Sequence, residues 1–230
     1  MSSFNMVEEL RNEERARRTA AADFVRACQS GDVHKLYEAV DFINERTVGG
    51  WTTAIRKLAR EIRVVSPDIQ YAFQRVWIES KMLPRRVDDH PALCEAARIL
   101  LPKYQGPSVR LFRGAGAVER CRRAYGMSWS TQIAAAERFA EERRVMDGGS
   151  VLLETLAPPE AIISAIVYPE PFTEAEIAEL QARYPGVVIE EASGYGAEGE
   201  YVLDRRLLGA VQVIRRLAPL PRSGELSLVA

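Results

Sequence analysis

Residues 109–114, VRLFRG, mark the point at which the pattern of the chain changes. A short run of β-branched and aromatic residues that ends at a glycine is typical of a strand. The residues before it carry apolar side chains at helical spacing, and the residues after it form several similar short runs. We therefore predict an α+β protein that divides near Gly106. A helical lobe at 1–105 is expected to pack on a second part at 106–230, and a single continuous domain is the alternative.

The first part predicts consecutive helices with clear start signals. A first helix is expected to end near Gly31, and Asp32 is placed to cap the next one. Ser66 and Pro67 stand at the N-cap and first position of a later helix. Gly49 and Gly50 interrupt the pattern between these two. The helices that we expect cover 33–46, 52–65, 68–80 and 91–101.

The second part carries short apolar runs bounded by glycine, proline or aspartate, which are strand candidates. Two amphipathic helices are expected between them, and Thr173 with Glu176 forms a capping box at the start of the second. The expected helices cover 131–144 and 173–184, and the expected strands cover 109–114, 150–156, 161–168, 186–192, 200–204 and 209–217.

The composition narrows the functional class. The 230 residues are 47% hydrophobic and 27% charged, with a formal net charge of -1. This is enough for a sizeable core and does not indicate disorder or a general polyanion binder. The stretch 11–18 mixes arginine with glutamate at helical spacing, which favours a solvated helix face over a nucleic-acid patch. Nucleic acid is therefore not the favoured partner.

Other features concern location and metals. Residues 1–18 lack the apolar segment of a secretory signal, and no run approaches the roughly 18 apolar residues of a membrane span. Three scattered cysteines argue against a disulfide framework or a zinc site. His34 and His90, in or beside helical segments, favour surface or capping roles. We expect a protein without metal or membrane partner, in the cytoplasm of the producing cell or of a target cell after Sec-independent delivery.

Arg113 and Gly114 end the first strand candidate. An arginine there can direct its planar fork at a phosphate, while the glycine lets the backbone approach a ligand closely. The alternative for such an arginine is a surface ion pair.

Ser128 and Ser130 lie in the stretch GMSWSTQIAAAERFA, residues 126–140. Side chains two positions apart in a strand share one face, so both hydroxyls are candidates for the same cleft. The alternative is that Ser130 or Thr131 caps the helix that follows.

Glu198 and Glu200 lie in GYGAEGEYVLD, residues 194–204, again two positions apart. Like charges on one face of a strand repel each other, which favours a cation that binds between them. The alternative is a charged edge that keeps the strand soluble.

The three motifs together resemble the arginine-serine-glutamate class of mono-ADP-ribosyltransferases, of the bacterial toxin and phage effector type. The resemblance covers the chain from about Arg110 onward, and the helical part is similar only in kind to the helical lobe of related toxins. It implies the fold of that family, a mixed or antiparallel β-sandwich core that binds NAD. It also implies that NAD, as co-substrate, is cleaved at its nicotinamide–ribose bond and that ADP-ribose passes to an acceptor, most simply a protein arginine.

The resemblance implies a cofactor-binding role for several residues. Arg113 would hold the NAD phosphate or ribose, and Gly114 would offer its backbone to the nicotinamide amide. Ser128 and Ser130 would line the same site. Phe139, in the AxxFA segment, resembles the family aromatic near the nicotinamide pocket, and a place in the core is the alternative.

The resemblance also implies catalytic roles. Glu200 would be the catalytic carboxylate, and Ser128 would orient it while supporting the ribose. Glu198 would activate the acceptor, and a glutamate at this position is similar to the arginine-modifying subgroup. Tyr195 would lie on the loop that recognises the acceptor.

Trp129 departs from the family pattern, which has threonine between the two serines. In an alternating strand this side chain faces away from its neighbours, so we expect it to pack in the core together with Met127. Three other functions stay open: an NAD glycohydrolase, a transferase that acts on nucleic acid or a small molecule, and an inactive interaction module of transferase fold. An inhibitor or antitoxin protein is a further expected partner.

Overall fold

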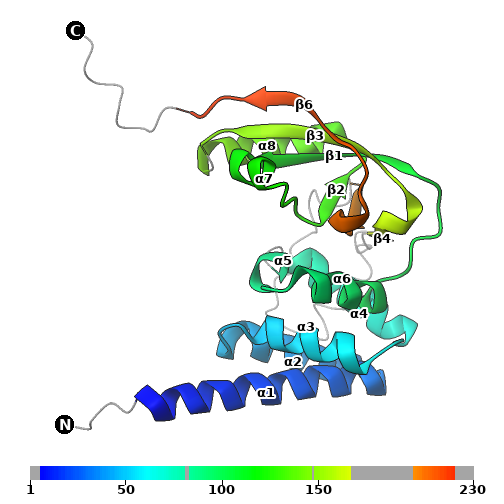
Figure 1. The fold of residues 1–230 in the computed structure, drawn as a ribbon. Coiled ribbons are helices and arrows are strands. Elements are labelled where there is room, and N and C mark those ends of the chain that lie inside the picture. Colours follow the sequence, from blue (N-terminus) through cyan, green and yellow to red (C-terminus); the bar gives the residue numbers. More distant parts are fainter. Residues whose placement is uncertain (1–5, 81–82, 147, 167–198, 221–230) are drawn as a thin grey trace, which may run out of the picture. The chain divides into compact units, whose positions relative to one another are not determined.

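The computed structural model describes residues 6–80, 83–146, 148–166 and 199–220 (Figure 1). The chain divides into two compact units, which we call the helical unit, Met1–Tyr104, and the sheet unit, Gln105–Ala230. The helix expected over 173–184 and the strand expected over 186–192 lie outside the described residues. No described helix combines the length and the apolar character that crossing a membrane requires.

The helices of the helical unit pack against one another, including pairs that are not consecutive in the sequence. Here α1 packs against both α2 and α3, and α3 packs against α6. The helix predicted over 52–65 is α3, and it begins two residues earlier than predicted, at Gly50. Gly49, directly before it, adopts a left-handed conformation with φ of 70°. The helices are α1 (Met6–Ser30), α2 (Val33–Arg46), α3 (Gly50–Glu61), α4 (Pro67–Glu79), α5 (Leu83–Arg86) and α6 (His90–Leu100).

Side-chain caps begin three of these helices. The Asp32 carboxylate accepts a hydrogen bond from the backbone N–H of Lys35, and this bond is the main reason why the pKa of Asp32 lies below its usual value. Ser66 caps α4 in the same way, with Pro67 in the first turn, as the sequence predicted. Asp89 caps α6. Each cap satisfies a backbone donor that the helix itself leaves unpaired.

An aromatic cluster forms the centre of the helical unit. The ring of Phe24 meets those of Trp51 and Phe73 edge-on, with centroids 5.7 and 6.3 Å apart. All three side chains are almost fully buried. The indole N–H of Trp51 donates to Asn44 Oδ1 at 2.9 Å, so the one polar group of this ring is satisfied.

The described part of the sheet unit combines antiparallel strands with the helices α7 and α8, which confirms the α+β class. Its described strands are β1 (Val109–Gly116), β2 (Ser128–Ser130), β3 (Ser150–Ala157), β4 (Ile162–Ala165), β5 (Glu200–Leu203) and β6 (Val211–Leu217). Its described helices are α7 (Ala117–Arg122) and α8 (Ile133–Met146), with short 3-10 turns at Pro159–Ala161 and Arg205–Leu207. The sequence had predicted five of these strands and α8, and it had left open whether the Ser128 segment is a strand or a turn.

The strands form one hydrogen-bonded sheet in the order β4-β5-β2-β1-β3-β6, and all neighbours are antiparallel. The β1–β3 ladder is continuous over eight residue pairs, whereas β1 meets β2 through the single pair Phe112–Ser130. In Figure 1, α8 lies along β1 and β3.

Trp129 in β2 is part of the core of the sheet unit. Its side chain is 2% exposed, its indole N–H donates to the Gly126 carbonyl at 3.1 Å, and its ring meets Tyr125 edge-on. Met127 is buried as well. The expectation that the bulky residue between the two serines packs inward is therefore confirmed.

Candidate functional site

The three motifs meet on neighbouring strands. Arg113 lies on β1, Ser128 and Ser130 form the ends of β2, and Glu200 begins β5. Because β2 is hydrogen-bonded to β1 on one side and to β5 on the other, three segments that are distant in the sequence are brought together here.

The register of β2 and β5 makes Ser130 the direct neighbour of Glu200. Ser130 pairs with Glu200, and Ser128 pairs with Val202. Ser128 is therefore a diagonal neighbour of Glu200 on the same face of this ladder, at a Cα separation of roughly 7–8 Å. The resemblance gives the role of orienting Glu200 to Ser128, whereas the pairing gives the nearest position to Ser130.

The hydroxyl of Ser130 is part of the turn that leads into α8. It accepts a hydrogen bond from the Gln132 N–H at 2.8 Å and lies 3.1 Å from the Gln132 carbonyl, to which it donates. The side chain is buried. Both bonds go to Gln132, which precedes the first residue of α8, Ile133, and they hold the Ser130 side chain in the turn beside β5.

Arg113 reaches from β1 to the chain that enters β2. Its Nη1 donates to the Ser128 carbonyl at 2.6 Å, and its Nη2 donates to Glu119 Oε2 at 3.2 Å. The ion pair expected as the alternative for this arginine does form, with Glu119, but it is mostly buried, since the Arg113 side chain is 15% exposed. Among the described residues, the buried Nε of Arg113 has no hydrogen-bond partner.

The pleat of the sheet places Arg113 and Glu200 on opposite faces. Arg113 follows Phe112, and Phe112 is the partner of Ser130. Regular alternation from this pair directs Arg113 to the face opposite Ser130 and Glu200. A ligand that contacts both Arg113 and Glu200 therefore has to extend past the start of β2.

Gly114 is the point at which α8 approaches β1. A Cβ built on it would lie 2.8 Å from the Phe139 carbonyl carbon and closer still to the Ala140 nitrogen and the Ala136 oxygen. Phe139 itself is 40% exposed, with the guanidinium carbon of Arg138 5.5 Å from the ring centroid. The core alternative for Phe139 is therefore wrong.

Comparison of the chain with protein-family models, with curated proteins and with solved structures gives no match.

Glu198 and Tyr195 lie outside the described residues. The residue between the two glutamates, Gly199, is described and adopts a left-handed conformation with φ of 52°. Its carbonyl accepts a hydrogen bond from the Thr131 N–H at 3.0 Å. This hydrogen bond connects the start of β5 to the turn between β2 and α8, and it therefore helps to determine where Glu200 enters the sheet.

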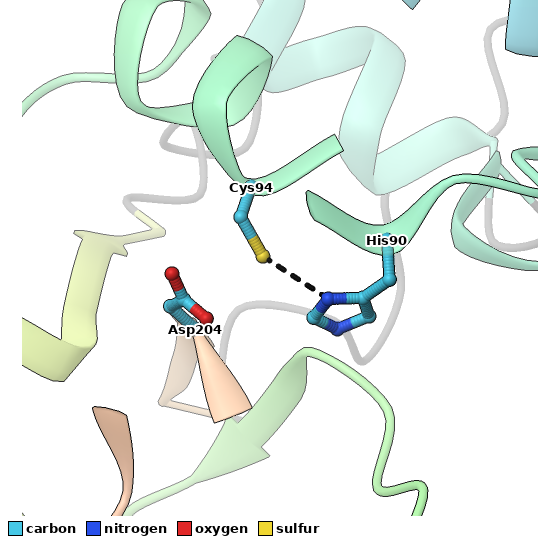
Figure 2. Close-up of side chains that lie close together, drawn as sticks. All are labelled: His90, Cys94 and Asp204. Carbon is cyan, nitrogen blue, oxygen red and sulfur yellow. Dashed lines mark hydrogen bonds between the residues drawn. The ribbon is translucent and has the colours of Figure 1, made fainter. Parts of the chain in front are cut away.

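The two histidines lie in the helical unit. His34 is exposed, 3.7 Å from Glu38, as expected for a surface residue. His90 begins α6, and its Nδ1 lies 3.4 Å from the Sγ of Cys94 one turn later (Figure 2). Asp204, which is also drawn in Figure 2, follows β5 in the sheet unit, where its carboxylate accepts hydrogen bonds from Arg206 and from the backbone of its own turn.

Glu119 is the residue of this region that the sequence did not reveal. It lies on α7, a six-residue helix that was not predicted. One of its oxygens contacts Arg113, and the other lies 4.0 Å from Arg143 on α8. The stretch between Gly116 and Gly126 carries no apolar periodicity long enough to predict a helix, so the sequence held no signal that would have brought Glu119 to Arg113.

Proposed function

We propose that this chain is a mono-ADP-ribosyltransferase of the arginine-serine-glutamate class, which cleaves NAD between nicotinamide and ribose and transfers ADP-ribose to a protein arginine. The observation that carries the proposal is the strand order β5-β2-β1, because it makes neighbours of the segments that hold Glu200, the two serines and Arg113. The segments are neighbours although Arg113 and Glu200 face opposite sides of the sheet, so the proposal requires one NAD molecule to extend past the start of β2 between them.

The charges near Arg113 suit a phosphate. Two guanidiniums, those of Arg113 and Arg143, flank the single carboxylate of Glu119, and all three side chains are at least three-quarters buried. A guanidinium in such a mostly buried place binds an anion more strongly than one at an exposed surface does. Arg113 also keeps donor positions beyond the two hydrogen bonds given above.

Glu200 is the proposed catalytic residue. In NAD the ribose is bonded to a cationic pyridinium nitrogen; when this bond breaks, nicotinamide leaves as a neutral molecule with the bonding electrons and the ribose acquires oxocarbenium character. A carboxylate beside that ring stabilises the positive charge more strongly in the transition state than in the ground state. Glu200 is half-buried at the start of β5, next to the Ser130 position, where its orientation is restricted by the ladder.

We assign the activation of the acceptor arginine to Glu198. An arginine side chain is protonated at neutral pH, since its pKa exceeds about 12, so it needs a carboxylate to orient it and to take its proton as the bond forms. Its position two residues before Glu200 in the sequence is the support for this assignment.

The test is release of nicotinamide from NAD by the purified chain, with and without an arginine acceptor. We expect Glu200→Gln to lose about 100- to 1000-fold in turnover, which corresponds to roughly 3–4 kcal/mol, while NAD binding is retained. Glu137→Gln is the matched control, because Glu137 pairs with Arg215 at 2.7 Å on the exposed side of α8. Intact NAD after incubation with the wild-type protein would refute the proposal.

The acceptor can be identified with biotinylated NAD in a bacterial lysate. We expect label on protein that is lost with Glu200→Gln. Label on nucleic acid or on a small molecule would show that this molecule, and not a protein arginine, is the acceptor. Free ADP-ribose alone would show that the acceptor is water.

A further inference from the structure

The guanidinium of Arg113 is enclosed by residues of two other segments. Ser128 and Glu119 accept its two hydrogen bonds, at 2.6 and 3.2 Å. On a third side lies Gly126: a Cβ built there would be 2.8 Å from Cζ and 3.1 Å from Nη1 of Arg113, and closer still to Nη2. We call this enclosure, made of Glu119, Gly126 and the Ser128 carbonyl, the Arg113 slot.

We propose that Glu119 and Gly126 are positioning residues that hold Arg113 in the orientation in which it binds the phosphate of NAD. The inference rests on the proposed function for the identity of the ligand, whereas the slot itself is a property of the described residues. Neither residue belongs to the motif that suggested the function.

Glu119 acts through charge and hydrogen bonding. It lies between Arg113 and Arg143, with its second oxygen 4.0 Å from the Arg143 Nη2. Without this carboxylate Arg113 would lose the acceptor of its Nη2 and the opposite charge beside it, so its present rotamer would be held less firmly. Glu119 thus fixes the direction of the Arg113 guanidinium.

Gly126 acts through its lack of a side chain. The atoms that an added methyl would meet belong to the far end of a flexible side chain, so the backbone does not have to move to accommodate it. Gly126→Ala is therefore expected to displace the Arg113 guanidinium without moving the backbone of β1 or of residue 126. It perturbs the orientation of Arg113 without changing any charge, which makes it complementary to Glu119 variants.

The first measurement does not depend on catalysis. Phenylglyoxal modifies accessible guanidinium groups, and mass spectrometry of the peptide that contains Arg113 gives its rate of modification. We expect the rate for Arg113 to rise at least fivefold in Glu119→Ala and in Gly126→Ala, and to stay at the wild-type rate in the control Glu137→Ala. Unchanged protection of Arg113 in both variants would overturn the slot.

The second measurement separates binding from chemistry. In nicotinamide release, we expect Glu119→Ala and Gly126→Ala to raise KM for NAD about tenfold or more with kcat within about twofold. Glu119→Gln, which retains an oxygen acceptor, should recover part of the loss. An unchanged or lowered KM in both alanine variants, while Arg113→Lys raises it, would overturn the positioning role. An inert wild-type protein together with Arg113 exposed in the variants would refute the proposed function and leave the slot standing.

Discussion

Gly114→Ala tests how tightly α8 is packed on the sheet. The added methyl would lie 2.8 Å from the Phe139 carbonyl carbon and closer to the Ala140 nitrogen and the Ala136 oxygen. All three atoms belong to the backbone of α8, so no side-chain rotation can relieve the contact. Either α8 moves away from β1 as a whole or the strand bends, and both disturb the layer that contains Ala136 and Ala140, which are almost fully buried.

The magnitude follows from two opposing effects. Overpacking a well-filled interior costs about 1–3 kcal/mol. Replacing a glycine whose conformation alanine can also adopt stabilises by about 0.4–1 kcal/mol through the unfolded chain. Gly209 provides the control, because nothing lies within 4 Å of a Cβ built on it and its φ is not positive. Both variants gain this second contribution, since neither glycine has a positive φ, so it cancels in the comparison. Gly114→Ala should therefore be less stable than Gly209→Ala by the overpacking cost, about 1–3 kcal/mol.

Hydrogen exchange is the suitable assay because it reports on α8 separately from the helical unit. Amides of peptides from 133–146 and 109–116 should exchange faster in Gly114→Ala than in the wild type, at a denaturant concentration that leaves Gly209→Ala protected. Equal protection of α8 in the two variants would show that the helix is not packed against Gly114 and would refute the reasoning. A loss of protection in the helical unit as well would show that the effect is not local.

Three further outcomes are expected. Arg56 and the N–H of Ala92 donate to the Asp89 carboxylate and hold its pKa below the usual value, with Arg56 the larger cause, so Asp89→Ala should cost about 1 kcal/mol at neutral pH. The stability that Asp89 contributes is present above the ordinary carboxyl pKa and is lost as the pH falls through the lowered pKa of the folded protein. The melting temperatures of the wild type and of Asp89→Ala should therefore converge on acidification. A difference in melting temperature that stays constant with pH would contradict this. Burial raises the pKa of the Cys28 thiol to about 12, so iodoacetamide at pH 8 should label the exposed Cys121 first, and equal rates at both would be inconsistent with the fold. Glu198→Ala should suppress transfer to arginine more than hydrolysis of NAD, and parallel loss of both would remove the assigned division of roles.

Local signals predicted most of the helical unit. Asp32 and Ser66 are caps in the structure because a short side chain with an oxygen satisfies backbone donors wherever a helix starts, whatever the rest of the protein does. The helix predicted over 68–80 ends at Glu79 as α4, and Pro84 lies inside the short α5 that follows. The proline there begins a new turn, since its missing N–H is not needed in the first turn of a helix.

The sequence could not predict how strands that are distant along the chain pair with one another. The alternation of Ser128, Trp129 and Ser130 predicted which side chains share a face, and the burial of Trp129 confirms it. It could not predict which hydroxyl lies opposite Glu200, because register depends on the turn before β5 and on its attachment through Gly199 and Thr131. A shift of two residues would have left the same faces and exchanged the two serines.

The environment of Arg113 explains why an arginine suits this position better than a lysine. Its two Nη atoms serve acceptors that come from different elements, the Ser128 carbonyl on β2 and the Glu119 carboxylate on α7. A planar fork can donate in both directions while its charge stays between them, whereas an ammonium group is a compact point charge with no fixed direction. The same hydrogen bonds that make Arg113 a structural link also remove the rotamer freedom that it would otherwise lose on binding an anion. A structural role and a ligand-binding role for Arg113 therefore support each other, because an arginine held in advance loses less freedom when a phosphate arrives.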